Sequence, residues 1–219
     1  MANIRSYSEL MQGHRQLIWN SYDEKVAPLL TQEGADTAFL DRGKVLFQAV
    51  IDLQEAQESE YEEKADASLA WQVGWDDEYA AFMELRRIMK SFVVGNELLY
   101  EKLQLKGTVS RSKMEFIQLA QRVYKAALRH VADLSGLGAA RLNQEEFTER
   151  LGMIEALLDL RGTYENEKSD AVHATKERNR KYKELHQYSN QLKALALVAL
   201  KDEPQLIERL GIGLRSRRQ

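Results

Sequence analysis

The chain of 219 residues is 44% hydrophobic and 30% charged, a globular composition large enough for one sizeable core or two smaller ones. A net charge of −3 argues against a strongly basic nucleic-acid-binding protein, and the absence of cysteine excludes disulfides and thiolate chemistry. The N-terminal sequence lacks the apolar segment of a signal peptide, and the longest apolar run, residues 194–200, is too short for a bilayer. We therefore expect a soluble, cytoplasmic protein without a membrane-spanning segment.

Helix is favoured along almost the whole chain, because only 2 prolines and 12 glycines interrupt runs of strong helix formers. In the first half, apolar residues spaced three and four apart predict three helices. Their apolar faces are, in order, Met11, Ile18, Tyr22, Val26 and Leu29, then Leu46, Ala49, Leu53 and Ala56, then Tyr79, Phe82, Leu85, Met89 and Phe92.

The connection between the second and third of these helices has two interpretations. The polar segment 54–68 contains no proline, so it is either a turn or part of one uninterrupted, protruding helix. The sequence VGWD at 73–76 offers a break, with Asp76 as the N-cap of the third helix. The segment 161–176 in the second half allows the same two interpretations.

A short fourth helix is predicted to close the first half. Asn96 serves as its N-cap, and YEKLQL at 100–105 ends it with Gln104 in a left-handed conformation, which strains any residue other than glycine. Leu105 then folds back on the last turn as a hydrophobic plug.

The second half follows the same plan. Ser112 caps its first helix, and Asn143 with Glu146 three residues later forms a capping box that opens the second. The short last helix has Asp202 as the expected N-cap, Pro204 in its first turn, and a Schellman ending at IERLGI, residues 207–212. The apolar faces of the three longer helices are Ile117, Ala120, Tyr124, Ala127, Val131 and Leu134, then Phe147, Leu151, Ile154 and Leu158, then Tyr182, Leu185, Tyr188, Leu192, Leu195 and Ala199.

Self-similarity between the halves predicts an internal duplication. Tyr22 aligns with Tyr124 at an offset of 102, EKADA at 63–67 with EKSDA at 167–171 at 104, and YEKLQL with IERLGI at 107. We expect an all-α, internally duplicated antiparallel helical bundle, with repeat units at 1–110 and 111–219 packed together as one structural domain. Each unit would contain about three long helices and a short capping helix.

Three stretches resemble a bacterial family of tandem helical-repeat proteins that has no assigned activity. They are QRVYKAAL at 121–128, ALALVALKDEPQLIERLGI at 194–212 and FVVGNELLYEKLQLKG at 92–107. The resemblance implies the helical class and the duplication, and it supplies no catalytic residue.

The sequence contains few candidates for chemistry. Asp170, His173 and Glu177 are spaced to share one helix face and form a candidate metal site, but the position matching His173 is Leu69, so a symmetric second half is missing. His14 and His130 are expected to be partly buried structural residues. A Gly-rich phosphate loop and a nucleophile elbow are absent, so we expect neither a cofactor nor a catalytic residue, and the sequence favours a protein that is not an enzyme.

The two halves differ most in charge. Residues 54–78 hold nine acids against Lys64, whereas residues 158–182 hold six bases against five acids, so the same helix turn has opposite sign in the two copies. Trp71 and Trp75 lie four residues apart beside the acids, as core residues or as an aromatic patch for a partner. The candidate interaction residues are Trp71, Trp75, Asp76, Asp77, Glu78, Arg178, Arg180 and Lys181.

These features favour a non-enzymatic helical scaffold that uses complementary charged faces to contact itself or another protein. The competing hypothesis is a ligand-binding or enzymatic bundle with a site between the repeats, using Tyr22, Tyr79, Tyr124, Tyr182 and His173. A third hypothesis is a weak anion or nucleic-acid adaptor that uses the bases between Lys176 and Lys183 and the tail Arg215, Arg217 and Arg218.

Overall fold

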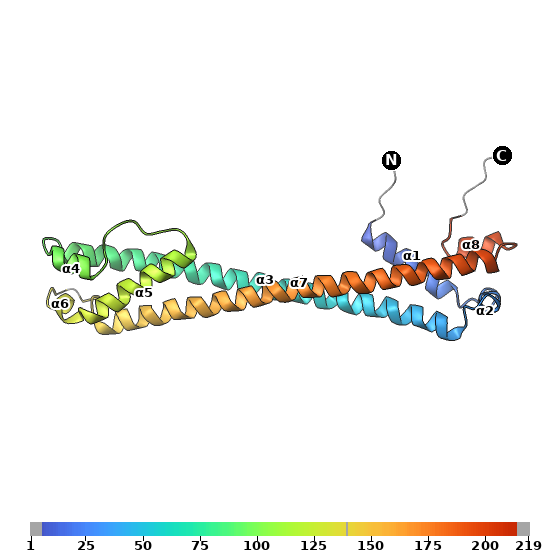
Figure 1. Ribbon diagram of the computed structural model, residues 1–219, viewed down its shortest axis with the longest axis horizontal. Coiled ribbons are helices and arrows are strands. Elements are labelled where there is room, and N and C mark those ends of the chain that lie inside the picture. The colour runs from blue at the N-terminus through green and yellow to red at the C-terminus, as the bar shows by residue number, and fades with distance from the viewer. Residues whose placement is uncertain (1–5, 139, 214–219) are drawn as a thin grey trace, which may run out of the picture. The chain divides into compact units, whose positions relative to one another are not determined.

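The computed structural model describes residues 6–138 and 140–213, and the regular structure in these ranges is helical, without a strand (Figure 1). The all-α prediction is therefore confirmed. The helices are α1 (Tyr7–Asn20), α2 (Ala27–Gln32), α3 (Thr37–Phe92), α4 (Glu97–Lys102), α5 (Lys113–Arg129), α6 (Val131–Ser135), α7 (Gln144–Ala199) and α8 (Pro204–Arg209).

Helices α3 and α7 are each a continuous helix of 56 residues. Of the two interpretations of the polar segments, the uninterrupted helix is the one that forms, and the prediction of three long helices per half is wrong. The break at 73–76 does not form, and Asp76 lies inside α3, where it accepts a hydrogen bond from Gln72 Nε2 one turn earlier at 2.8 Å. No proline interrupts either helix, and Gly74 packs against the ends of Leu157 and Leu160. Without a breaker, backbone hydrogen bonding continues through the polar segment.

The two halves of the chain have the same order of elements. A first helix of 14 or 17 residues, a short one of 6 or 5, the 56-residue helix and a final helix of 6 residues follow one another in each half. The two halves therefore correspond in the order and in the approximate lengths of their helices.

Contacts divide the chain into two compact units, and the division differs from the expected boundary at residue 110. Unit 1 contains Met1–Glu60 and Asp170–Gln219, and unit 2 contains Tyr61–Ser169. Each unit therefore takes residues from both halves. The physical reason is the fusion of helices: once α3 and α7 are continuous, each contributes one part of its length to each unit.

Unit 1 buries α1, α2 and α8 against the first part of α3 and the last part of α7. Ile18, Leu30 and Leu192 are fully buried at its centre. At Gly43 a Cβ would lie 2.5 Å from the Tyr188 ring, so glycine permits this close approach of α3 and α7. Tyr188 Oη donates a hydrogen bond to the Phe39 carbonyl at 3.1 Å, which fixes the position of its ring.

Unit 2 has an aromatic core where α5 packs on α3. The Phe116 ring lies 5.1 Å from that of Tyr79 and 5.4 Å from that of Phe82, and Tyr124 lies 5.6 Å from Phe82. These tilted and edge-to-face arrangements are those that aromatic pairs favour. Trp71 lies in the same core, because residues spaced three and four apart share one face of α3.

The short helices α4 and α8 end as predicted. The Ile212 amide donates to the Ile207 carbonyl and the Gly211 amide to the Glu208 carbonyl, the hydrogen-bond pattern of a Schellman motif. Gly211 has φ 74°, and Gln104 in the equivalent ending has φ 56°. The hydrophobic plug is also confirmed, because Leu105 and Ile212 are buried.

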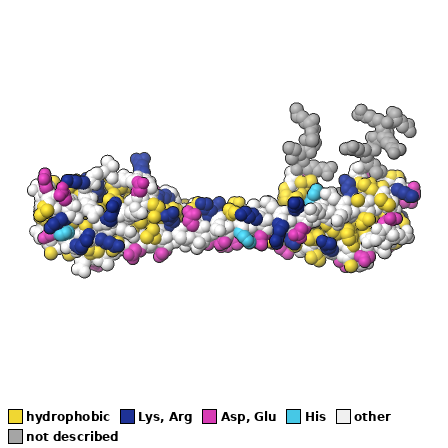
Figure 2. Space-filling view, viewed as in Figure 1, with side chains coloured by type: hydrophobic (Ala, Val, Ile, Leu, Met, Phe, Trp, Pro, Cys, Tyr) yellow, Lys and Arg dark blue, Asp and Glu magenta, His cyan; other side chains and the backbone are white. Residues whose placement is uncertain are grey.

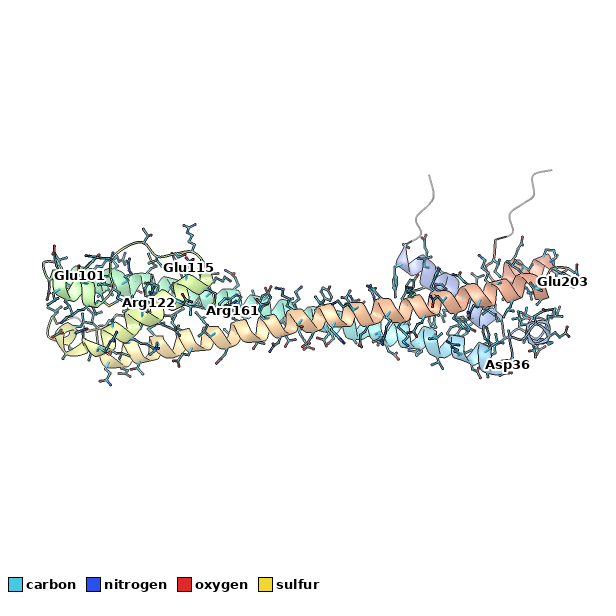
Figure 3. All side chains as sticks on the ribbon, viewed as in Figure 1. Asp36, Glu101, Glu115, Arg122, Arg161 and Glu203 are labelled. Carbon is cyan, nitrogen blue, oxygen red and sulfur yellow. The ribbon has the colours of Figure 1, made fainter. Side chains whose placement is uncertain are left out.

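The N-caps of the short helices differ. Asn96 Oδ1 accepts a hydrogen bond from the Leu99 amide at 3.1 Å, which confirms its capping role. In α8 the N-cap is Glu203 rather than the predicted Asp202, and its side chain makes no capping bond. Figure 3 labels Glu203 at the start of α8 and Asp36 just before α3, where Asp36 Oδ1 accepts from the Phe39 amide at 2.8 Å.

Candidate functional site

The two tryptophans proposed as a partner surface belong to the core of unit 2. Trp71 is 8% exposed, and the Trp75 ring stacks on Tyr79 with centroids 4.9 Å apart. Lys113 Nζ lies 4.9 Å from the Trp71 ring centroid and 5.4 Å from that of Trp75, a cation–π arrangement. Both tryptophans therefore pack α3 against α5, and neither forms an exposed aromatic patch for a partner.

The acidic run 76–78 is divided by the helix periodicity. Asp76 and Asp77 are exposed, whereas Glu78 is 4% exposed because it lies on the core face, one turn from Phe82. Glu78 Oε1 accepts a hydrogen bond from Tyr124 Oη at 2.9 Å, and Arg150 Nη1 lies 3.3 Å from Glu78 Oε2. Glu78 therefore belongs to a structural network inside unit 2 rather than to an interaction surface.

Burial has the largest effect on the pKa values of Glu78 and Tyr124 in this network. It raises the pKa of the Glu78 carboxyl, while the Tyr124 hydrogen bond and the charge of Arg150 act in the opposite direction. Burial and the neighbouring carboxylate raise the pKa of the Tyr124 hydroxyl. Tyr124 therefore remains a hydrogen-bond donor at physiological pH.

The three basic candidates belong to unit 1 and differ in their surroundings. Arg178 Nη1 donates to Gln57 Oε1 at 2.8 Å, and its guanidinium lies 5.5 Å from the Tyr7 ring centroid. Lys181 Nζ pairs with Glu184 of the same helix at 2.7 Å. Arg180 is exposed. Arg180 is the candidate of these three that lies most openly on the surface.

An acidic stripe lies along the exposed face of α3 in unit 2. The helix periodicity places its members on one side, and each of them is exposed. We define the acidic stripe as Glu62, Asp66, Leu69, Val73, Asp76 and Asp77. Leu69 and Val73 are 63% and 49% exposed, so the stripe combines carboxylates with apolar side chains.

A basic stripe occupies the corresponding face of α7 in unit 1. We define it as Val172, Lys176, Arg180 and Lys183, all exposed. Val172 is 48% exposed and is its apolar member. On the face of the molecule drawn in Figure 2, hydrophobic side chains likewise lie among charged side chains of both signs.

Of the candidate metal residues, Asp170 and His173 are exposed and Glu177 is half-buried. His173 Nδ1 lies 3.9 Å from Glu177 Oε2, and the His173 side chain is 71% exposed. Within residues 6–138 and 140–213, Asp170, His173 and Glu177 do not converge on one point with three ligand atoms. Their arrangement is that of a surface i,i+4 pair.

The tyrosines of the competing ligand hypothesis are distributed between the units, Tyr22 and Tyr182 in unit 1, Tyr79 and Tyr124 in unit 2. Tyr22 Oη donates to Asp41 Oδ1 at 2.6 Å. Burial raises the pKa of the Tyr22 hydroxyl most, and this hydrogen bond raises it further. The hydroxyls of Tyr22 and Tyr124 therefore serve hydrogen bonds within their own units. The arginines of the tail hypothesis, Arg215, Arg217 and Arg218, lie outside the described residues.

A polar pocket in unit 1 was not predicted. It lies among α1, α7 and the turn after α8, and it has a volume of about 150 Å³. His14 of α1 and His186 of α7 face each other with ring centroids 5.5 Å apart. Burial and the neighbouring His186 lower the pKa of His14 to about 4, so His14 is neutral at pH 7.

The turn after α8 closes one side of this pocket and is held by α1. Gln16 Nε2 and Asn20 Nδ2 donate to the Arg209 carbonyl at 3.2 and 2.6 Å. A Cβ at Gly211 would lie 2.9 Å from the Gln16 amide group and would displace it, and the φ of 74° at Gly211 favours glycine. The sequence predicted partial burial of His14, and only this long-range packing brings it against His186.

Comparison with known proteins yields no match: no protein-family model, curated protein or solved structure corresponds to the chain. Within the described residues, no helix is both long and apolar enough to span a membrane.

Proposed function

We propose that this protein is a non-enzymatic helical scaffold, built by internal duplication, that assembles head to tail with copies of itself. The acidic stripe of one molecule would bind the basic stripe of the next. Such a heterologous contact leaves the other stripe of each molecule available, so it produces rings or filaments.

The observation that carries this proposal is the difference in charge between equivalent exposed positions, which is fully opposite at Asp77 and Arg180. At an offset of 103 residues, Val73, Asp76, Asp77 and Ala80 correspond to Lys176, Asn179, Arg180 and Lys183, and all eight are exposed. A single solvated face requires no such complementarity. Opposite potentials on two separate faces favour encounter in one orientation and disfavour pairing of like faces.

Exposed apolar side chains add a non-electrostatic contribution. Leu69 and Val73 lie within the acidic stripe and Val172 within the basic one. Apolar groups rimmed by charges are typical of interaction surfaces, because their burial stabilises the complex while the charges fix its register.

The test is sedimentation velocity at low and high ionic strength. We expect assemblies at about 0.02 M salt that dissociate at about 0.5 M, where screening shortens the reach of exposed charges. Arg180→Glu combined with Lys183→Glu should abolish assembly at low salt, as should Asp76→Lys combined with Asp77→Lys.

Mixing the two double variants provides the control. Each variant keeps one stripe intact, the acidic stripe in the first variant and the basic stripe in the second. These intact stripes match each other, so an equimolar mixture should regain complexes that contain both variants. A monomer at low salt, or a mixture that remains dissociated while both variants stay folded by circular dichroism, would contradict the proposal.

A further inference from the structure

The polar pocket of unit 1 is built from three elements that are far apart in sequence. α1 contributes His14, α7 contributes His186, Ser189 and Lys193, and the turn after α8 contributes Gly211. A cavity of about 150 Å³ can hold a molecule about the size of benzene. The pocket is therefore suited to a small molecule or to the end group of a larger one.

Two buried polar atoms of the pocket lack hydrogen-bond partners. His14 is 8% exposed and its Nε2 is unpartnered, and Ser189 is 3% exposed with an unpartnered Oγ. Buried polar atoms are almost always hydrogen-bonded in folded proteins, because an unsatisfied one is destabilising. Both residues line the same pocket, so these two unpartnered groups belong to side chains that border anything bound there.

The aligned positions in unit 2 are filled by that unit's own side chains. Ser189 corresponds to Arg86, whose Nη2 donates to the carbonyls of Leu105 at 2.9 Å and Gly107 at 2.8 Å. His14 corresponds to Phe116, which is fully buried among aromatic rings. The helical architecture therefore does not require the polar pocket of unit 1.

The charge of the pocket indicates the chemistry of its ligand. Lys193 is the one formally charged side chain among the described residues that line it, and no carboxylate lines it. The surrounding side chains are hydrogen-bond donors or groups able to donate: the imidazoles of His14 and His186, the Ser189 hydroxyl and the Asn190 amide. This set complements an anion.

We propose that the pocket binds a small anion, a carboxylate or phosphate group, held by Lys193, Ser189 and the two histidines. A divalent metal fits less well, since two imidazoles without a carboxylate make an incomplete ligand set and Lys193 repels a cation. The proposal does not depend on self-assembly, because the pocket and the stripes share no residue.

The test is a titration of the full chain with inorganic phosphate and, separately, with acetate, followed by NMR of the histidine rings and by calorimetry. We expect saturable shifts of the His14 and His186 resonances and a rise in the pKa of His14, since an adjacent anion favours the imidazolium form. Tighter binding of phosphate or of acetate then identifies the preferred anionic group. Sodium chloride at equal ionic strength controls for screening.

Lys193→Gln and Ser189→Ala should each weaken binding by about tenfold or more. The matched controls are Lys90→Gln, at the aligned position of unit 2, and Ser91→Ala, an exposed serine of α3. Ser189→Ala should raise the melting temperature without ligand, because it removes a buried unpartnered hydroxyl, and should reduce the further rise caused by phosphate. A hydroxyl with a purely structural role would give a lower melting temperature.

Three results would overturn the proposal. The first is no saturable histidine shift with either anion up to about 10 mM, a concentration far above a millimolar Kd. The second is equal binding by Lys193→Gln and wild type. The third is stabilisation by Zn²⁺ alone, with no response to anions, which would assign the histidine pair to a metal.

Discussion

Burial of His14 makes the free energy of unfolding depend on pH. Its ordinary pKa of 6.5 falls to about 4 in the folded protein through burial and the nearby His186. Tyr182, His186 and Lys193 of α7 are the titratable neighbours of its ring and pocket. Between these two pKa values the unfolded chain binds a proton that the folded chain does not.

We therefore expect acidification from pH 6.5 to pH 4 to lower the free energy of unfolding by up to about 3 kcal/mol through His14. Well above pH 6.5 His14 is neutral in both the folded and the unfolded chain, so it no longer changes the free energy of unfolding with pH. His14→Phe, which places the unit 2 residue at this position, should remove the dependence. Urea unfolding across this pH range measures the effect.

The exposed His173 provides the control, since His173→Gln should preserve the wild-type pH dependence. The difference between wild type and His14→Phe isolates one group from the carboxyls that titrate in the same range. Parallel pH profiles for wild type and His14→Phe would mean that His14 is not the responsible group.

At the scale of elements, the helix endings follow from a few neighbouring residues. Gln104 and Gly211 occupy equivalent left-handed positions with φ 56° and 74°. Only glycine adopts this conformation without strain from its side chain. The ending of α4 therefore carries a strain that the ending of α8 avoids.

Gln104→Gly should stabilise the protein by about 1 kcal/mol, because it relieves the left-handed strain. Gly211→Ala should destabilise it by more, because the new Cβ also meets the Gln16 amide at 2.9 Å. Thermal unfolding of both variants measures the two effects. Equal and small changes in both would show that neither position is strained.

These endings, the Asn96 cap and the helical class could be predicted from the sequence because capping and helix propensity act over a few residues. For α3 and α7 the same local rules left two outcomes open, a turn or one uninterrupted helix, and could not decide between them. A glycine and an aspartate at 74 and 76 are a typical stop signal, yet packing of Gly74 on Leu157 and Leu160 accompanies an unbroken helix. The sequence also could not predict which candidate site residues are buried. Burial of Trp71 and Glu78 depends on contacts with α5 and α7, which are far away in the sequence.

At the scale of the whole molecule, the chain maintains two separate cores. Ile18 of α1 is fully buried in unit 1, and Ile117 of α5 is 1% exposed in unit 2. These residues form a matched pair, since they have the same side chain and nearly equal burial on the first helix of each half.

Ile18→Ala and Ile117→Ala should each destabilise the protein by about 2–5 kcal/mol, because each leaves a cavity in a packed core. Hydrogen exchange should then show lost amide protection in α1 and α8 for Ile18→Ala, and in α4 and α5 for Ile117→Ala. Loss of protection in both sets of helices with either variant would indicate one cooperative core instead of two.

The sequence by itself determined that the protein is helical, where its short helices end, and that its two halves differ in charge. These properties depend on neighbouring residues or on composition. Tertiary structure decided that each half extends into both units, that Glu78 is buried against Tyr124, and that His14 faces His186 beneath the turn after α8. Those outcomes depend on contacts between residues far apart in the chain, which no local pattern specifies.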